Sequence, residues 1–293
     1  MKAAPFDYHA PTTLEEAVGL LGELGDGAKV LAGGQSLIPM LALRLAFFDH
    51  LVDLGRIDSL QAIERVDGSL RVGAAVRQSA IERSADVATA VPLLSLATPL
   101  IGHFQIRNRG TLGGSIAHAD PAAEYPAVAR ALDAEMEIAS PRGARSVPAE
   151  EFFAATFMTD LADDEVLAAV RFPVWEGRCG FAVEELARRH GDFAIAGATV
   201  AVELGDGDTV RRCAIGMFGV GSVPERGSAA EEGAAGTAVG DLDPRQLGEL
   251  ATSTLDHIPT DAHGPAEYRR HVAGVMVARA WERAVQEARD ARD

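Results

Sequence analysis

The chain has 293 residues, 47% of them hydrophobic, and 27 Lys and Arg against 43 Asp and Glu give it a formal net charge of −16. The apolar fraction excludes a disordered chain, and the length predicts roughly two domains. Such an acidic chain repels nucleic-acid phosphates, so nucleic acid is excluded as a non-specific partner. Two cysteines, Cys179 and Cys213, are too few for a disulfide framework or an iron–sulfur cluster.

The N-terminal segment predicts a strand–loop–helix–strand unit after a first helix. Apolar positions recur at helical spacing from Leu14 to Leu24. Thr12 and Thr13 each have Glu three residues on, Glu15 and Glu16, which predicts the helix start. The elements that follow are a buried strand over residues 28–32, a glycine loop over 33–36, a short helix over 37–45 and a strand over 50–54.

The middle of the chain mixes a hairpin with helices. Asp67-Gly68 lies between two short alternating runs, which predicts a β-hairpin. The other expected elements are helices over 78–90, 92–101 and 122–132, a polar stretch over 105–109, a second glycine loop over 110–115, and strands over 135–139 and 166–172.

The last part predicts a sheet followed by helices. Strands are expected over 181–187, 194–204 and 209–220, and a closing helix over 265–288, while residues 225–240 fit either helix or loop. Hairpins and helices are mixed without strict strand–helix alternation, so the predicted class is α+β. The predicted segments are residues 1–56, 57–175 and 176–293.

Two short segments, 32–36 and 111–115, each carry paired glycines closely followed by a hydroxyl residue. Glycine lets backbone N–H groups approach a phosphate, and successive N–H groups before a helix form an anion nest. A single Gly-Gly pair usually only makes a turn, whereas two such pairs suggest that both segments contact the same ligand. No P-loop or complete G-x-G-x-x-G motif is present, which disfavours P-loop and Rossmann folds.

Together these segments resemble the FAD-binding medium subunit of molybdenum hydroxylases, the carbon monoxide dehydrogenase and xanthine dehydrogenase family. The resemblance rests on residues 32–37 (AGGQSL) and 111–121 (TLGGSIAHADP). It runs essentially end to end, from residues 6–8 through 101–103, 107–110 and 191–194 to the C-terminal domain. It implies a two-lobed FAD-binding fold of the PCMH or vanillyl-alcohol-oxidase type, formed by residues 1–56 and 57–175. A C-terminal α+β domain, residues 176–293, would follow, and the FAD would be held non-covalently.

The resemblance also implies which residues contact FAD. Residues 29–37 would wrap the pyrophosphate, and Ile101 and Gly102 would lie near the flavin. The other residues would complete the pyrophosphate, ribose, adenine and isoalloxazine contacts. The implied contacts are Lys29, Val30, Leu31, Ala32, Gly33, Gly34, Gln35, Ser36, Leu37, Ile101, Gly102, Gly110, Thr111, Gly113, Gly114, Ser115, His118, Asp120, Ala123, Glu124, Leu161 and Phe193. Some relatives have Lys where Glu184 stands, so a charged flavin contact is not transferred there, and Arg188 or Arg189 is the alternative.

For several polar residues the sequence leaves more than one interpretation open. His118 is either a cofactor contact or an ordinary hydrogen-bonded histidine, and His103 is more typical of the latter. Arg107 and Arg109 fit phosphate counter-charges, a partner contact or a solvated turn, of which the turn is favoured. Asp120 either orients the second glycine segment and bonds the ribose, or caps the helix after Pro121.

The function implied is electron transfer through FAD to an external acceptor, with the molybdenum cofactor on a large partner subunit and [2Fe–2S] clusters on a small one. A dimer of heterotrimers is the expected assembly. The alternatives are a free-standing FAD oxidoreductase of the same fold and an assembly subunit with a degraded flavin site. No catalytic residue and no metal ligand is predicted. An apolar signal core is absent and Arg44 interrupts the most apolar tract, so we expect no membrane insertion and a cytoplasmic protein.

Overall fold

The computed structural model describes residues 2–291, so the first residue of segment 1–56 and the last two of segment 176–293 lie outside the described residues. The chain begins with a small parallel sheet of strand order β1-β3-β2. Its strands are β1 (Asp7–His9), β2 (Ala28–Leu31) and β3 (His50–Asp53). Helix α1 (Leu14–Leu24) begins as predicted, because the Thr13 hydroxyl accepts a hydrogen bond from the backbone N–H of Glu16 at 3.1 Å.

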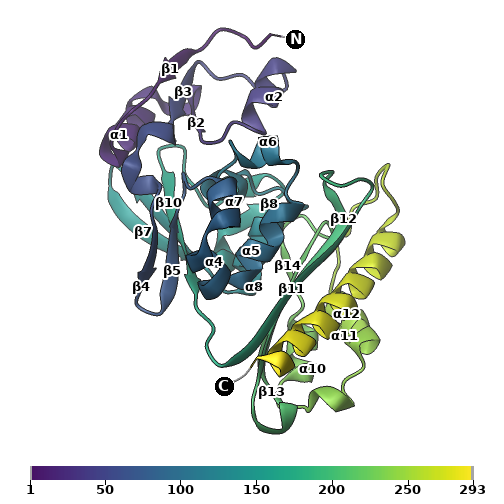
Figure 1. Cartoon of the computed structure of the whole chain (residues 1–293). Helices are drawn as coiled ribbons and strands as arrows, with labels where there is room; N and C mark the ends of the chain where they lie inside the picture. Colours follow the sequence, from purple (N-terminus) through teal and green to yellow (C-terminus); the bar gives the residue numbers. More distant parts are fainter. Residues whose placement is uncertain (1, 292–293) are drawn as a thin grey trace.

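Helix α2 (Leu37–Ala42) follows the first glycine segment and is shorter than the predicted 37–45. Arg44 adopts a left-handed backbone conformation with φ of +58°, which an α-helix does not accommodate. The first turn of α2, at Ile38 and Pro39, lines the cavity described below. The helix lies near the top of Figure 1.

A five-stranded antiparallel sheet of order β4-β5-β10-β6-β7 forms the centre of the molecule. Its strands are β4 (Ile63–Val66), β5 (Ser69–Gly73), β6 (Glu135–Ser140), β7 (Gly143–Pro148) and β10 (Val166–Pro173). The β4–β5 hairpin and strands β6 and β10 were predicted. Strand β7 was not, because it lies at the edge of the sheet and has mostly exposed residues without alternating hydrophobicity.

Short helices cover one face of this sheet, and α1 packs against the other. The helices are α3 (Gln78–Arg83), α4 (Ala85–Ala90), α5 (Pro92–Ala97), α6 (Phe104–Arg107), α7 (Leu112–His118), α8 (Glu124–Ala131) and α9 (Ala149–Phe152). The single helix predicted over 78–90 is wrong: Ser84 has an extended backbone, and its hydroxyl caps α4 by accepting from Val87 N–H. Helix α8 begins two residues later than predicted, and α6 forms where only a polar stretch was expected.

The C-terminal part is a four-stranded antiparallel sheet in chain order, covered by three helices. Its elements are β11 (Arg178–Ala187), β12 (Ala194–Leu204), β13 (Val210–Phe218), β14 (Glu225–Arg226), α10 (Ser228–Ala234), α11 (Pro244–Thr252) and α12 (Ala266–Asp290). The ambiguous segment 225–240 thus contains a short strand and a helix. Smaller elements are β8 (Phe153–Ala155), β9 (Met158–Thr159) and 3-10 turns at Gly25–Gly27, Leu54–Arg56, Asp58–Leu60, Thr98–Leu100, Asp206–Asp208 and Val239–Asp241.

Strand β12 lies between the C-terminal helices and the helices of the central part, and all of its residues are buried. Val200 and Val202 pack into the core under α12, whereas Ala201 points into the core of the central sheet and its helices. Figure 1 shows α12 running along one side of the C-terminal sheet, with α5 and α8 on the other side. No helix within residues 2–291 has both the length and the apolar character needed to cross a membrane.

Helices α11 and α12 cross at two glycines, and this contact gives a first prediction. A Cβ added at Gly248 would lie 2.1 Å from the backbone oxygen of Gly274. We expect Gly248→Ala to lower the free energy of unfolding by about 1–3 kcal/mol, because helix backbones in contact cannot accept the added methyl group. Gly240→Ala is the control, since nothing lies within 4 Å of its added Cβ. Equal midpoints of thermal unfolding for the two variants would contradict the prediction.

Candidate cofactor site

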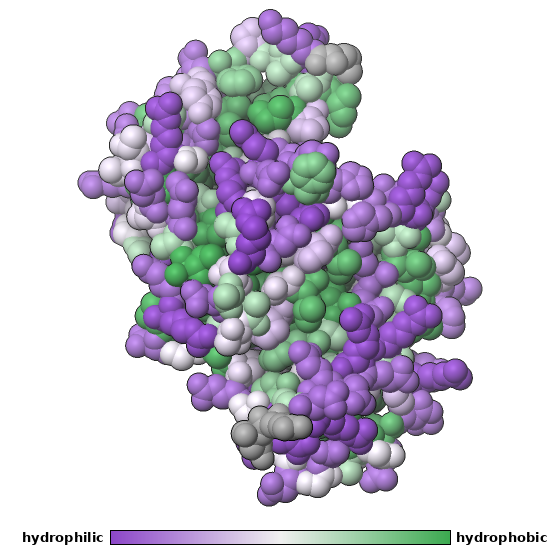
Figure 2. Space-filling model, viewed as in Figure 1, coloured by the Kyte–Doolittle hydropathy of each residue, from purple (hydrophilic) through white to green (hydrophobic). Residues whose placement is uncertain are grey.

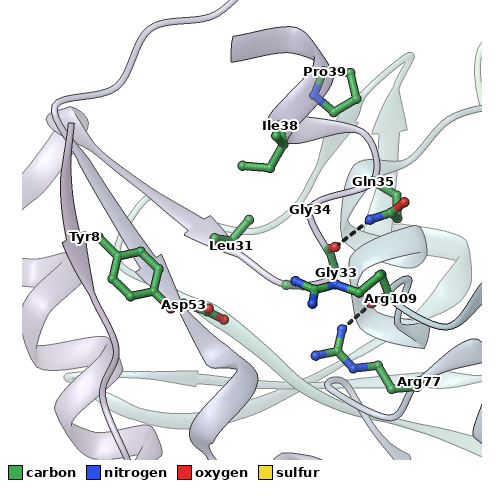
Figure 3. Close-up of a pocket in the computed structure, with 11 residues that line it drawn as sticks. Tyr8, Leu31, Gly33, Gly34, Gln35, Ile38, Pro39, Asp53, Arg77 and Arg109 are labelled. Atoms are coloured by element: carbon green, nitrogen blue, oxygen red, sulfur yellow. Dashed lines mark hydrogen bonds between the residues drawn. The ribbon is translucent and has the colours of Figure 1, made fainter. Parts of the chain in front are cut away.

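The carboxyl ends of the three parallel strands border a cavity of about 480 Å³. Tyr8 comes from β1, Leu31 ends β2 and Asp53 ends β3 (Figure 3). Ligands of parallel sheets bind beyond these strand ends. The Tyr8 hydroxyl donates to Asp53 Oδ2 at 2.6 Å, a bond that raises the pKa of Tyr8, and Asp53 Oδ1 accepts from Gly55 N–H.

The first glycine segment runs along this cavity. Gly34 has φ of +73°, a conformation open mainly to glycine, and the Gln35 amide donates to Gly33 O at 3.0 Å. Within residues 2–291 the backbone N–H groups of 33–36 have no hydrogen-bond acceptor. These consecutive free donors, followed by the start of α2 at Leu37, are suited to phosphate oxygens.

Two arginines give the cavity a positive charge. Arg77 Nη1 donates to the backbone oxygen of Arg109, and the two guanidinium groups lie on the same side of Gly33 in Figure 3. Burial, together with the neighbouring charge of Arg109, lowers the pKa of Arg77, while Asp53 acts in the opposite sense. Two cations beside one carboxylate favour an anionic ligand.

The second glycine segment is the first turn of α7, not the predicted loop. Thr111 caps this helix, and its hydroxyl accepts from Gly114 N–H at 3.0 Å. The N–H groups of Leu112 and Gly113 donate to Val76 O and Ala74 O, so they are not free for an anion. This segment therefore packs closely and presents side chains, Ser115 among them, whereas the free amides belong to the first segment.

The two glycine segments touch each other, although they are far apart in the sequence. A Cβ added at Gly33 would lie 2.4 Å from Arg109 O and 2.6 Å from Gly110 Cα. A Cβ added at Gly114 would lie 3.2 Å from Ala32 Cβ. The absence of side chains at these positions is what allows the two segments to form one surface.

The residues after α7 continue this surface. His118 ends the helix, its ring centroid lies 4.9 Å from that of Phe157, and burial lowers its pKa. Asp120 Oδ1 accepts from Ala122 N–H at 2.9 Å, which closes a turn. Asp120 does not cap the following helix, because the capping position of α8 is Ala123. Lys29, on β2, acts electrostatically on His118 and lies 5.9 Å from the Phe48 ring centroid.

Glu124, the first residue of α8, is a buried carboxyl group with only 8% of its surface exposed. Burial raises its pKa to about 8, and the nearby carboxylate of Glu185 adds to this shift. Burial likewise raises the pKa of Glu185 to about 7, and Glu185 Oε2 has no hydrogen-bond partner among the described residues. Glu184, on the opposite face of β11, instead pairs with Arg283 of α12, so it is not a free group for a flavin contact.

Arg107 is buried, with 9% of its surface exposed, so the favoured solvated turn is wrong for this residue. Its guanidinium binds Glu82 through two hydrogen bonds, at 2.9 and 3.0 Å. It also donates to the backbone oxygens of Ile101 and Gly102, at 3.1 and 3.2 Å. Arg107 therefore fixes the turn for which the sequence implied a position near the flavin.

The hairpin loop of residues 188–193, between β11 and β12, reaches the same turn. A Cβ at Gly191 would lie 2.7 Å from His103 Cε1, and the rings of His103 and His190 lie 5.9 Å apart. Phe193, at the end of this loop, is 70% exposed, and Leu161 packs partly buried against the central core. The surface is indented between α2 and this hairpin, at the right of Figure 2.

Sequence reasoning missed Tyr8, Asp53, Arg77 and Glu185. Asp53 ends parallel strand β3, and Tyr8 lies in β1 one residue before its end. Such positions signal a ligand site once the strands are recognised as parallel. Arg77 and Glu185 carried no motif. Among residues 2–291 no group of three metal-ligating side chains is found. Both cysteines are free, and burial raises their pKa values, to about 11 for Cys179 and to about 12 for Cys213.

Comparisons with known proteins agree with this architecture. Residues 4–175 match the family described as the FAD binding domain in molybdopterin dehydrogenase, and residues 181–284 match the CO dehydrogenase flavoprotein C-terminal domain. The chain is 38% identical over its whole length to subunit alpha of the 6-hydroxypseudooxynicotine dehydrogenase complex of Paenarthrobacter nicotinovorans, covering 99% of that protein.

Carbon monoxide dehydrogenase of Hydrogenophaga pseudoflava is similar in both sequence and structure. Its medium chain is 38% identical over 278 residues, which cover 94% of this chain and 95% of that protein. A solved structure of the enzyme that lacks the Mo-pyranopterin moiety superimposes with a TM-score of 0.94, at 39% identity over 98% of this chain and 99% of the matched chain. The chain therefore belongs to the FAD-binding medium subunits of molybdenum hydroxylases, the family of the carbon monoxide dehydrogenase medium chain.

Proposed function

We propose that this chain is the FAD-carrying electron-transfer subunit of a molybdenum hydroxylase complex. The observation that carries the proposal is the contact between the two glycine segments beside a cavity that holds two arginines and a row of free N–H groups. Membership of the family supports FAD as the ligand. The residues fit this cofactor, because free amides and guanidinium groups match a pyrophosphate and the carboxyl groups offer acceptors for hydroxyl and amino groups.

FAD would lie between the glycine segments and the hairpin loop 188–193. Residues 29–37 would surround the pyrophosphate, with Arg77 and Arg109 as counter-charges. Asp120 and Glu124 would accept hydrogen bonds from the adenosine part. Ile101, Gly102 and Phe193 would border the isoalloxazine. The hydrogen bonds from Arg107 to the Ile101 and Gly102 carbonyl groups fix the turn on that side of the site. The remaining implied contacts stay part of the proposed site.

Bound FAD would supply redox chemistry, receiving electrons from an iron–sulfur partner and passing them to an external acceptor. No acid or base of this chain is required for that step, so the chain's task is to bind, orient and shield the cofactor. The molybdenum cofactor and [2Fe–2S] clusters would reside on a large and a small partner subunit, as the multi-subunit complexes named among the relatives support. A dimer of heterotrimers in the cytoplasm is the proposed assembly.

We also propose that the chain is divided functionally at residues 56 and 175. The parallel sheet and the first glycine segment would form one FAD-binding lobe, and the central sheet with α3–α9 the other. Residues 176–293 would close the site through the hairpin loop.

The test is the absorption spectrum of the purified chain, with the chromophore released by heat and identified by mass. We expect flavin absorption and close to one FAD per chain. The second measurement is co-purification from the native host, in which we expect a molybdenum-containing large subunit and an iron–sulfur small subunit. A colourless chain that also fails to bind added FAD would contradict the proposal, and a yellow chain without partners would favour a free-standing flavoprotein.

A further inference from the structure

Arg269 of α12 is almost fully buried, with 4% of its surface exposed, and it connects two strand ends of the C-terminal sheet. Its Nη1 donates to Ile195 O at 2.6 Å and to Gly219 O at 3.0 Å. Its Nη2 donates to both carboxylate oxygens of Asp261 at 2.7 Å. The guanidinium thus ties the start of β12 to the residue just after β13.

Both of these backbone positions adjoin the proposed cofactor site. Ile195 lies two residues after Phe193, the last residue of the hairpin loop that reaches His103. Gly219 N–H donates to Pro121 O at 2.7 Å, next to Asp120 in the turn before α8. One side chain therefore fixes two of the places where the C-terminal sheet meets the FAD-binding part.

The contact at Gly219 is tight. Gly219 has φ of +77°, and a Cβ added there would lie 2.7 Å from Ile195 O. The two carbonyl groups that Arg269 binds are thus close together, and one nitrogen, Nη1, bonds both. The other nitrogen, Nη2, holds Asp261 at the same time, and a lysine ammonium, a single point on a flexible stem, lacks this second arm of the planar guanidinium. Buried carbonyl groups need donors, and losing the guanidinium removes the hydrogen bond that Arg269 supplies to each of the two.

We propose that Arg269 is a positioning residue for FAD, although it lies on α12 and outside the cavity. By fixing Ile195 and Gly219 it sets the spacing between the hairpin loop at 188–193 and the turn at Pro121, the two segments that would enclose the cofactor. This inference rests on the proposed function for the identity of the ligand, but the positioning of the two segments is measurable without any cofactor.

The test compares Arg269→Lys and Asp261→Asn with a matched control, Arg178→Lys. Arg178 also binds one carbonyl oxygen, that of Gly205 at 3.2 Å, and one carboxylate, Asp208 at 2.7 Å, but at the opposite end of the same sheet. Each full-length variant is examined for FAD dissociation constant, visible circular dichroism of the bound flavin, and amide hydrogen exchange without cofactor.

We expect Arg269→Lys to weaken FAD binding at least tenfold, to change the visible dichroism, and to speed exchange at residues 188–195 and 119–123. Asp261→Asn should do the same more weakly, and it keeps the test valid if Arg269→Lys does not fold. Arg178→Lys should leave all three unchanged. Variants that only lower the unfolding temperature, with wild-type FAD affinity, dichroism and local exchange, would overturn the inference.

The two proposals fail in different ways. A wild-type chain that binds no FAD overturns the proposed function, and with it the cofactor part of this inference. Unchanged exchange at 188–195 and 119–123 in both Arg269→Lys and Asp261→Asn overturns the positioning role, whatever the wild-type chain binds.

Discussion

Gly33→Ala is expected to abolish FAD retention while the chain stays folded. The added Cβ would lie 2.4 Å from Arg109 O and 2.6 Å from Gly110 Cα, and backbone atoms cannot move aside as a side chain can. The first glycine segment must therefore separate from the second, and the free N–H groups of 33–36 lose their alignment. We expect the FAD content of the purified variant to fall from close to one per chain to below one-tenth, measured by absorbance after release.

The matched control is Gly19→Ala, since Gly19 lies inside α1 with nothing within 4 Å of an added Cβ. Alanine is also the better helix former, so this variant should be at least as stable as the wild type and retain all of its FAD. Far-ultraviolet dichroism of Gly33→Ala distinguishes a lost site from a lost fold. Wild-type flavin content in Gly33→Ala would show that the contact between the two segments is not needed for binding.

Local signals in the sequence were strong enough to predict most of the elements that hold this site. Strand β2 and the following glycine segment were expected almost at their observed bounds, because a short apolar run ends at paired glycines. The class α+β and the family were predicted and are confirmed. Failures occurred where a tertiary contact decides the local structure.

Ser84 is an exception, because its cap is a local contact, with Val87 three residues on, that the helical periodicity masked. Its flanking residues continue the helical periodicity, yet its hydroxyl begins a new helix and the chain turns there. Arg107 does depend on a tertiary contact, because an arginine in a polar stretch is usually solvated, whereas here Glu82 and two carbonyl groups surround it. Glu82 lies 25 residues away in the sequence, too far to be recognised from spacing.

Glu185 shows most clearly what the sequence alone could not predict. Glu184 and Glu185 are neighbours with the same side chain, but successive residues of a strand point to opposite faces. Glu184 meets Arg283 on α12, while Glu185 is partly buried on the other face, where its charge raises the pKa of Glu124. Only the packing of α8 and α12 on the two faces of the sheet assigns these different environments.

The pair of Glu124 and Glu185 predicts that stability falls as the pH rises from weakly acidic to weakly alkaline values. The folded chain raises the pKa of Glu124 from 4.5 to about 8, chiefly through burial. Between those values the folded state holds a proton that the unfolded state has lost, so the free energy of unfolding decreases with pH. A shift of this size corresponds to an upper limit on the order of 5 kcal/mol. The charged groups that act on Glu124 are Glu185 and Asp120, both acidic, and both favour the protonated form.

Glu124→Gln should remove most of this dependence, because an amide keeps the shape of the carboxyl group without ionising. We expect the unfolding temperature of the FAD-free wild type to fall more steeply between pH 6 and pH 9 than that of the variant, by roughly 5 °C or more over this range. Glu184→Gln is the control: it removes the ion pair with Arg283 and should lower stability without flattening the pH profile. If Glu124→Gln and the wild type lose stability in parallel as the pH rises, the buried carboxyl pair does not titrate with folding. Glu124 follows the turn at Asp120, which is proposed to bind the adenosine part of FAD. Loss of its proton would add a negative charge to a site for an anionic cofactor, so the affinity for FAD should weaken over the same pH range.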